Sequence, residues 1–464
     1  MKNHTIEQFS IFISVTKWLI LSSIIGVVIG ASVTLFLKIL QFSEENQSLL
    51  PFKHYYLLPF ALVLTVWLVK KFAPDAHGHG TEKVIEAVHK KSGKIDLAVI
   101  PVKLFATVLT IFSGGSVGKE GPGAQIGAGM ASFVSDIFRF SKEDRKTLVI
   151  CGIGAGFASV FGTPIAGAVF GVEVLIVGLI RYDVLLPSFI AGFAAFSTAQ
   201  YLGIEYTYFN IHFHQEIGLD FILIMQVVLA GIFFGVISDI TITMLKKVSK
   251  VIEKLPMNKY FKAFFGGLVL ILLSLFVGEQ YFGLGLGTIE EMLTVHNYSN
   301  IDIPWYSFLF KTLFTSITLG VGGSGGIVTP VFYIGATSGH WFGTIIGNDQ
   351  VTFFAALGFI SVLAGTTNSP IAATIMAMEL FGIEVAHYAA ISVVISFLMT
   401  GHRSVFASQI LAMKKSNLLK IDIGDDISHT KVGMRDDDID KFRNIHESII
   451  IKRKKYKEKM KSKK

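Results

Sequence analysis

Apolar segments separated by short polar stretches run along most of the chain. Their lengths and hydropathy favour membrane-spanning helices over the alternating strands, about ten residues long, of a β-barrel. Glycine and proline interrupt many of them, and several are too long or too short for one straight span. This irregularity predicts tilted and broken helices whose non-helical backbone is buried in protein. The segments are 14–41, 53–73, 97–113, 121–140, 147–180 and 184–203 in the first half, and 218–245, 260–282, 305–319, 327–347, 351–382 and 386–400 in the second.

The second half of the chain repeats motifs of the first half in the same order. Gly114–Ala128 and Gly322–Ala336 share Gly-Gly-Ser, a further glycine, a proline and Ile-Gly-Ala at a spacing of 208 residues. Another shared motif, Pro-Ile-Ala, leads to Glu173 in one half and to Glu379 in the other. Matching glycine-interrupted apolar segments indicate the internal repeat of a transporter and point to its binding site. An odd number of crossings in each half would make the repeat inverted.

The repeat and the polar stretches divide the chain into five parts. After Phe406, a polar segment leads into a lysine-rich tail that is too short for a sizeable regulatory domain. We predict a cytoplasmic N-terminal segment (1–14), a first transmembrane repeat (15–203), an inter-repeat linker (204–217), a second transmembrane repeat with a C-terminal inner helix (218–418) and a polar, Lys-rich cytoplasmic tail (419–464).

The composition confines the chain to polytopic membrane proteins. Hydrophobic residues make up 52% of the sequence and charged residues 16%, with a mean hydropathy of +0.59, which is too apolar for a soluble domain of this length. The net charge of +7 comes from the C-terminal end, because Lys452–Lys464 holds nine Lys/Arg and one Glu. Such a tail is typical of the cytoplasmic side, where it meets anionic lipid, and without interleaved aromatic residues it does not indicate nucleic-acid binding. The single Cys151 allows no intrachain disulfide.

One ionisable acid lies inside the first glycine-rich turn. Glu120 falls in the run SGGSVGKEGPGAQ between two apolar segments, at a depth where a charged side chain costs at least about 2.5–3.5 kcal/mol. The surrounding glycines allow a sharp turn, and Pro122 suits the first turn of a helix. The sequence therefore predicts a helix N-terminus whose amide groups face an anion.

These motifs resemble those of the CLC chloride channels and chloride/proton antiporters across about residues 15–418. GKEGP at Gly118–Pro122 resembles the family's G(K/R)EGP signature, and GIVTP at Gly326–Pro330 is similar to its GxFxP. Gly78-His79-Gly80 stands where a GSGIP-like motif is usual, and HRSVF at His402–Phe406 stands where a tyrosine-bearing segment is usual.

The resemblance implies an all-α polytopic membrane protein, an inverted repeat of tilted and broken transmembrane helices that forms a homodimer with one anion pathway per subunit. It implies that Glu120 is the gate, whose carboxylate competes with the anion for the amide groups of its own helix and swings away when protonated. Lys119 either raises the local anion concentration or snorkels to the interface. The residues expected at the anion are Gly118, Lys119, Gly121, Ile327 and Val328, with His79 and Phe406 on the intracellular side.

Three positions depart from the family pattern. His79 replaces the usual serine and exchanges a hydroxyl for an imidazole, and Phe406 replaces the usual tyrosine and removes a phenolic donor. Val174 occupies the position where the family's antiporters carry an intracellular proton glutamate. Glu120 and Glu173 remain candidates for a proton pathway. A counterpart of Glu173 in the other repeat favours instead a structural role for this residue at helix ends or the dimer interface.

We therefore predict passage of chloride and similar small monovalent anions, gated by Glu120 and channel-like or weakly proton-coupled because of Val174. The alternative is a proton-coupled antiporter for chloride, or for fluoride, since His79, Val328 and Phe406 all depart from the usual pattern. A cation-coupled nutrient transporter is a remote alternative, because it would use carboxylates or unwound carbonyl groups.

The spans contain no paired nucleophile and base, so we predict no enzyme, catalytic residue, metal or cofactor. The expected partners are the anion, protons, membrane lipid and a second copy of the chain, in the plasma (inner) membrane with a cytoplasmic C-terminus.

Overall fold

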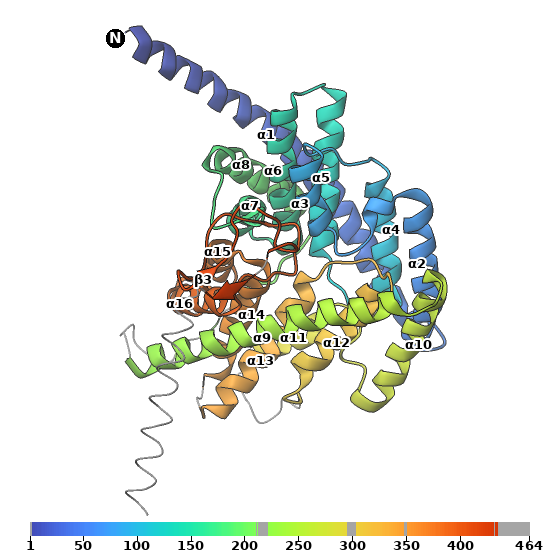
Figure 1. Ribbon diagram of the computed structural model, residues 1–464. Helices are drawn as coiled ribbons and strands as arrows, with labels where there is room; N and C mark the ends of the chain where they lie inside the picture. The colour runs from blue at the N-terminus through green and yellow to red at the C-terminus, as the bar shows by residue number, and fades with distance from the viewer. Residues whose placement is uncertain are drawn as a thin grey trace, which may run out of the picture.

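The computed structural model describes residues 2–209, 211, 221–294, 303–347, 350–430 and 432–434 and is almost entirely helical (Figure 1). The first half contains α1 (Lys2–Glu45), η1 (Asn46–Leu49), η2 (His54–Leu57), α2 (Leu58–Phe72), η3 (Pro74–Ala76), α3 (Thr81–Lys90), α4 (Val99–Phe112), α5 (Glu120–Ile137), α6 (Lys142–Phe161), α7 (Pro164–Glu173) and α8 (Tyr182–Tyr201). The second half contains α9 (Phe221–Lys254), α10 (Lys259–Val277), α11 (Leu286–Thr294), α12 (Ser307–Gly320), α13 (Val328–Ile345), α14 (Val351–Thr367), α15 (Pro370–Phe381) and α16 (Ile383–Met399).

Short strands tie the C-terminal segment to the helices. The strand β1 (Ile176–Val177) pairs in parallel with β2 (Ile410–Leu411), and β3 (Leu419–Lys420) pairs antiparallel with β4 (Gly433–Met434). The basic tail Lys452–Lys464 lies outside the described residues.

Five helical segments in the described part of the chain are long and apolar enough to cross a membrane. They are His4–Leu49, His54–Phe72, Tyr182–Tyr201, Phe221–Lys254 and Lys259–Val277. Among the shorter apolar helices, α7 lies between two of these segments in the chain, and α15 follows the last of them. The all-α membrane fold predicted from the apolar segments is thus confirmed.

Two long apolar segments each break into two helices, as their glycine and proline content predicted. Helix α6 ends at Gly162, which has a positive φ of 73°, and α7 begins at Pro164. In the other repeat, α14 ends at Asn368 with φ of 57° and α15 begins at Pro370. A left-handed residue ends each first helix, and proline has no N–H to leave unpaired at the start of the next.

The two repeats are inverted, and they meet where the two glycine-rich turns pair. The N–H of Gly118 donates to the carbonyl of Gly326 at 2.7 Å, and the N–H of Gly326 donates back to the carbonyl of Gly118. The pairing is antiparallel. From this point α5 extends into the upper half of Figure 1 and α13 into the lower half. The helices that follow the two equivalent turns therefore run in opposite directions, as in an inverted repeat.

Buried hydroxyl groups join the repeats in symmetric pairs. The hydroxyl oxygen of Thr110 accepts from the N–H of Ser324 at 3.2 Å, and that of Thr318 accepts from the N–H of Ser116 at 3.3 Å. Thr110 and Thr318, like Ser116 and Ser324, are 208 residues apart. The same spacing that defines the repeat in the sequence therefore defines the contacts across its interface.

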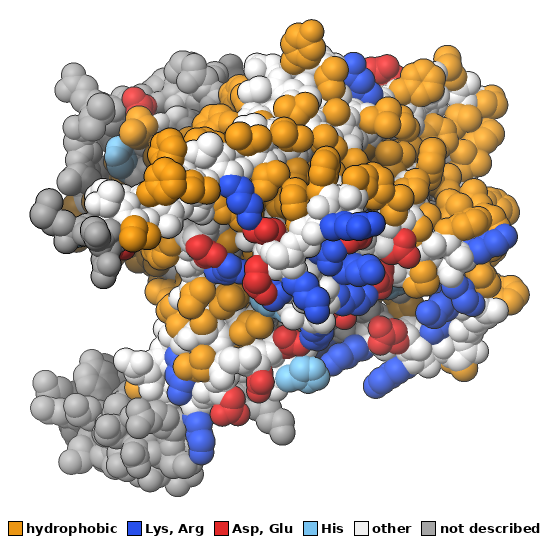
Figure 2. Space-filling view, turned by 90° about the horizontal axis from the view of Figure 1, so that it is seen from above, with side chains coloured by type: hydrophobic (Ala, Val, Ile, Leu, Met, Phe, Trp, Pro, Cys, Tyr) orange, Lys and Arg blue, Asp and Glu red, His pale blue; other side chains and the backbone are white. Residues whose placement is uncertain are grey.

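One face of the molecule is strongly charged. Figure 2, seen from above, shows Lys, Arg, Asp and Glu side chains gathered in a band that is bordered by hydrophobic side chains. Exposed ion pairs include Lys90 with Asp426 and Lys91 with Asp75. Exposed hydrophobic side chains beside a polar band are expected where a protein leaves the hydrocarbon region of a membrane.

Candidate functional site

The N-termini of α5 and α13 converge on the carboxylate of Glu120. This side chain is 1% exposed, and one of its oxygens accepts from the backbone N–H of Thr329 at 3.1 Å. The other oxygen accepts from the hydroxyl group of Thr329. We expected the carboxylate to engage the amide groups of its own helix; its bonds to Thr329 reach across to the helix of the other repeat. The carboxylate thus occupies the positive end of α13, a position suited to an anion.

Glycine is required on both sides of Glu120 because the backbones approach closely. A Cβ atom on Gly118 would lie 2.7 Å from the hydroxyl oxygen of Thr329. A Cβ atom on Gly121 would lie 2.0 Å from the carbonyl oxygen of His79. The loop of His79 is therefore packed directly against the first turn of α5.

The predicted anion-binding positions of the second repeat start α13. Ile327 is the N-cap and Val328 the first residue of this helix, and they are 3% and 1% exposed. Amide groups in the first turn of a helix have no acceptor within the helix. The structure therefore brings the start of α13, with Ile327 and Val328, next to Glu120 and Gly121 at the start of α5.

The side chains of His79 and Phe406 also meet. Their ring centroids are 5.6 Å apart, and Phe406 is fully buried. The Nδ1 atom of His79 is buried and has no hydrogen-bond partner among the described residues. A cavity of about 280 Å³ reaches His79 and Ile327 from solution. The imidazole therefore has an unused nitrogen at the mouth of the site.

Lys119 lies apart from this constellation. Its side chain is half-buried, and its charge acts on Glu44 near the end of α1. Lys119 thus acts on the site through its positive charge, and not by a hydrogen bond to the other described residues of the site.

Glu173 is held in a reciprocal exchange of helix caps rather than beside Glu120. Its carboxylate accepts from the N–H groups of Ile371 and Ala372 at 3.0 and 2.8 Å, at the start of α15. The carboxylate of Glu379 accepts from Ile165 and Ala166 at 2.9 and 2.8 Å, at the start of α7. Each repeat thus caps a helix of the other, in line with the structural role that its counterpart in the second repeat indicated.

Val174 is buried beneath the C-terminal segment. Its side chain is fully buried, and its carbonyl oxygen accepts from the Nε2 amide of Gln409 at 2.8 Å. The same amide group donates to the carbonyl of Thr367 at 2.8 Å. The C-terminal segment therefore closes over the position where the family's antiporters carry a second glutamate.

The sequence analysis missed two buried lysines. Lys103 donates to the carbonyls of Ala76 and Gly78 at 3.2 and 2.5 Å, in the loop that carries His79. Lys311 donates to the carbonyls of Tyr281 and Gly283 at 3.2 and 2.8 Å. Both are 0% exposed, and their spacing of 208 residues was a usable signal. They fix equivalent loops in the two repeats.

Comparison with known proteins gives consistent results. Residues 60–401 match the sequence model of the family described as voltage gated chloride channel. A chloride/fluoride channel protein of Pseudomonas syringae pv. tomato is 35% identical over 413 residues, which is 87% of this chain and 88% of that protein.

Solved structures show the same architecture. A CLC-type fluoride/proton antiporter superposes with a TM-score of 0.79 at 30% identity and covers 85% of this chain and 98% of its own. A slow cyanobacterial Cl⁻/H⁺ antiporter has a TM-score of 0.70 at 21% identity, covering 82% and 94%. At 21% identity, the similarity to the cyanobacterial protein shows a shared fold only.

Proposed function

This chain belongs to the family of CLC voltage-gated chloride channels, and from that membership we propose that it carries fluoride and chloride across the membrane in exchange for protons at Glu120. The observation that supports this is the position of the Glu120 carboxylate at the N-terminus of α13, where it is bonded to Thr329. A carboxylate and a halide cannot occupy this place together, because like charges in a desolvated site repel.

The exchange of an anion for a proton at Glu120 follows from the free energy needed to move its ionised carboxylate. When an anion enters the site, Glu120 leaves the amide groups of α13, and an ionised side chain would lose its stabilising donors inside the membrane. Taking up a proton removes this cost. The outward swing therefore carries a proton while the anion takes the vacated place.

The donors around the site suit a small, strongly hydrogen-bonding anion. A dehydrated fluoride needs directed N–H and O–H groups more than a larger halide does. The hydroxyl of Thr329 and the unpartnered Nδ1 of His79, in the tautomer that carries its proton there, provide such donors next to helix amides. This choice is supported by two similar proteins, a chloride/fluoride channel protein and a CLC-type fluoride/proton antiporter.

A second candidate is passive, Glu120-gated anion flow with weak proton coupling. It is favoured by the buried Val174 and by the engagement of both Glu173 oxygens on α15. Neither Glu173 nor Val174 can then bind and release a proton on the intracellular side. Under the exchange proposal, protons instead reach Glu120 through water in the cavity beside His79.

Efflux from liposomes tests the choice of substrate. Vesicles that contain the purified protein are loaded with potassium fluoride or potassium chloride, and release is followed with ion-selective electrodes after valinomycin and a protonophore are added. We expect both halides to leave, fluoride at least as fast as chloride. Release of neither anion above protein-free vesicles would overturn the proposed function.

Replacing Thr329 with valine should make the gate easier to open. Valine has nearly the shape of threonine but lacks the hydroxyl that donates to the charged carboxylate. A hydrogen bond of this kind contributes about 1.5–3 kcal/mol. Since this donor stabilises the ionised form, its loss lets Glu120 take up a proton at higher pH. We expect the pH of half-maximal anion flux to rise by about one unit in a pH series of vesicle assays. Thr329→Ser, which keeps the hydroxyl, is the control, and equal shifts in both variants would contradict the assigned bond.

We further propose that the charged face is cytoplasmic and that the protein is a homodimer in the plasma membrane. Lysines and arginines lie at the end of α2, along α3, at the start of α6 and at the end of α9, and Figure 2 shows Lys and Arg side chains gathered in the charged band. An excess of Lys and Arg marks the cytoplasmic side of membrane proteins.

A further inference from the structure

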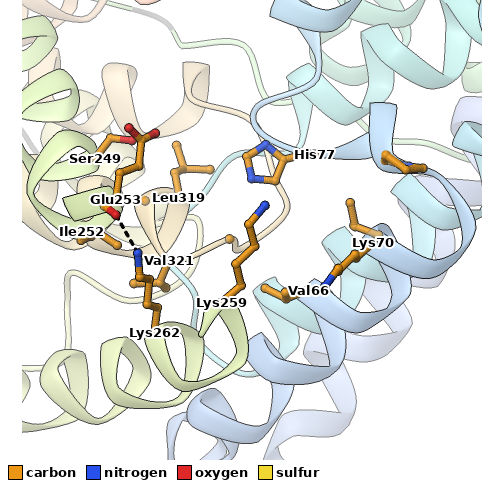
Figure 3. Close-up of a pocket in the computed structure, with 14 residues that line it drawn as sticks. Val66, Lys70, His77, Ser249, Ile252, Glu253, Lys259, Lys262, Leu319 and Val321 are labelled. Atoms are coloured by element: carbon orange, nitrogen blue, oxygen red, sulfur yellow. Dashed lines mark hydrogen bonds between the residues drawn. The ribbon is translucent and has the colours of Figure 1, made fainter. Parts of the chain in front are cut away.

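A second, basic cavity opens beside the anion pathway, between α2, the end of α9 and the start of α10. Its volume is about 310 Å³, within the range of small-molecule sites. Figure 3 shows Lys259 pointing from the first turn of α10 towards His77, with Lys70 on the facing side of α2. Lys262 also lines it.

The positive charges of this cavity are not neutralised by the protein. Among the described residues, Lys70, Lys259 and Lys262 form no ion pair. Lys262 donates to the backbone carbonyl of Glu253 at 2.9 Å, and Lys70 lies 5.4 Å from the ring centre of Tyr260. The single acidic side chain that lines the cavity leaves a net positive charge.

The start of α10 adds to this positive potential. Two lysines, Lys259 and Lys262, stand at the N-terminal end of the helix, and no acidic residue lies in its first turn. A cation at this end of a helix is disfavoured by the helix dipole. The same combination of amide groups, dipole and lysines is favourable when a phosphate binds between them.

The surroundings of the cavity indicate that the phosphate comes from lipid. Phe261 and Phe265 on α10 are 59% and 48% exposed, and Phe60 on the neighbouring α2 is 66% exposed. Trp67, with Lys71 at 4.8 Å from its ring centre, marks the membrane interface. An acyl chain can therefore lie along these helices while its headgroup enters the cavity. Basic pockets between helices on the cytoplasmic side bind anionic headgroups.

The cavity adjoins the anion pathway. His77, Ser249, Leu319 and Gly320 line both this cavity and the one that reaches His79. An occupant therefore contacts the two loops that lead to His79 and to the start of α13.

We propose that this cavity is a regulatory site for a phosphate group, carried by the headgroup of an anionic phospholipid, and that its occupancy tunes anion transport. Binding itself is independent of the transport mechanism; only the effect on rate rests on the proposed function.

The test compares Lys259→Gln/Lys262→Gln with Lys250→Gln/Lys254→Gln, a control with the same charge loss on exposed positions of α9 outside the cavity. Retention of phosphatidylglycerol and phosphatidylcholine by the purified full-length protein is measured by native mass spectrometry. Transport is measured in vesicles with and without phosphatidylglycerol. We expect wild type to retain phosphatidylglycerol preferentially, the cavity variant to lose at least ten-fold in apparent affinity, and the control to match wild type. Lys259→Arg/Lys262→Arg should retain binding.

Equal losses in both glutamine variants, or no preference of wild type for phosphatidylglycerol, would overturn the site. Competition by inorganic phosphate distinguishes the sources: binding of phosphate without binding of phosphatidylglycerol would keep the phosphate site and overturn its lipid origin. The retention assay gives its answer even if anion flux is absent, so failure of this site and failure of the transport function are separable.

Discussion

Glu120→Gln is expected to abolish proton movement while anion flux continues and becomes independent of pH. Glutamine is similar in shape and can still accept from Thr329, whose bonds now hold the carboxylate. It cannot take up or release a proton, and it does not repel an anion at the start of α13. Proton transport should fall by about 100-fold or more, the usual scale for loss of an essential acid–base group. The measurement is parallel recording of pH and halide from the same vesicles.

The control for this variant is Glu290→Gln, which removes an exposed carboxylate of α11. It should leave both fluxes at wild-type values. Continued proton transport in Glu120→Gln would show that another group carries the proton, and loss of both fluxes in a folded variant would indicate that Glu120 does not act as a gate.

Removing either reciprocal cap should destabilise the fold. Glu173→Ala leaves the half-buried N–H of Ile371 and the buried N–H of Ala372 without their acceptor. Glu379→Ala does the same to the exposed N–H of Ile165 and the half-buried N–H of Ala166. An unsatisfied buried donor costs about 1–3 kcal/mol, so Glu173→Ala should lose about 2–4 kcal/mol. In a chain of this length we expect the Tm in detergent to fall by roughly 2–4 °C. The fall should be smaller for Glu379→Ala, because the bond from Ile165 to Glu379 is exposed.

Glu173→Gln separates a cap from a proton carrier. The amide keeps one acceptor oxygen, so its Tm should fall by about half as much as that of the alanine variant. Proton transport per anion should remain as in wild type. An unchanged Tm combined with lost proton transport would instead make Glu173 a proton carrier and contradict its role as a cap.

The sequence was sufficient for the features that depend on local pattern. Glycine and proline within the apolar segments predicted broken helices, and the structure places two of the breaks at Gly162 and Asn368. The inverted orientation depended on the number of crossings, which the sequence left open. The opposite courses of α5 and α13 from the paired turns at Gly118 and Gly326 show it.

The contacts between repeats could not be read from either motif alone. Thr329 lies in the second motif, and only the meeting of α5 and α13 brings it to Glu120. Likewise, a shared structural role for Glu173 and Glu379 was foreseen, but the exchange of caps between repeats was not. Lys103 and Lys311 escaped notice because a lysine in an apolar helix usually extends to the membrane surface, whereas these two donate to buried loop carbonyls.

The most direct test of exchange at Glu120 is whether a fluoride gradient drives protons uphill through the wild-type protein. Vesicles with high internal potassium fluoride are placed in weakly buffered, fluoride-free medium at equal pH, the voltage is clamped to zero with potassium and valinomycin, and a pH electrode follows the outside. The exchange mechanism predicts that protons enter the vesicles as fluoride leaves, so that the medium becomes alkaline until a protonophore reverses the change. Fluoride efflux without any alkalinisation would contradict exchange at Glu120 and leave passive, gated flow.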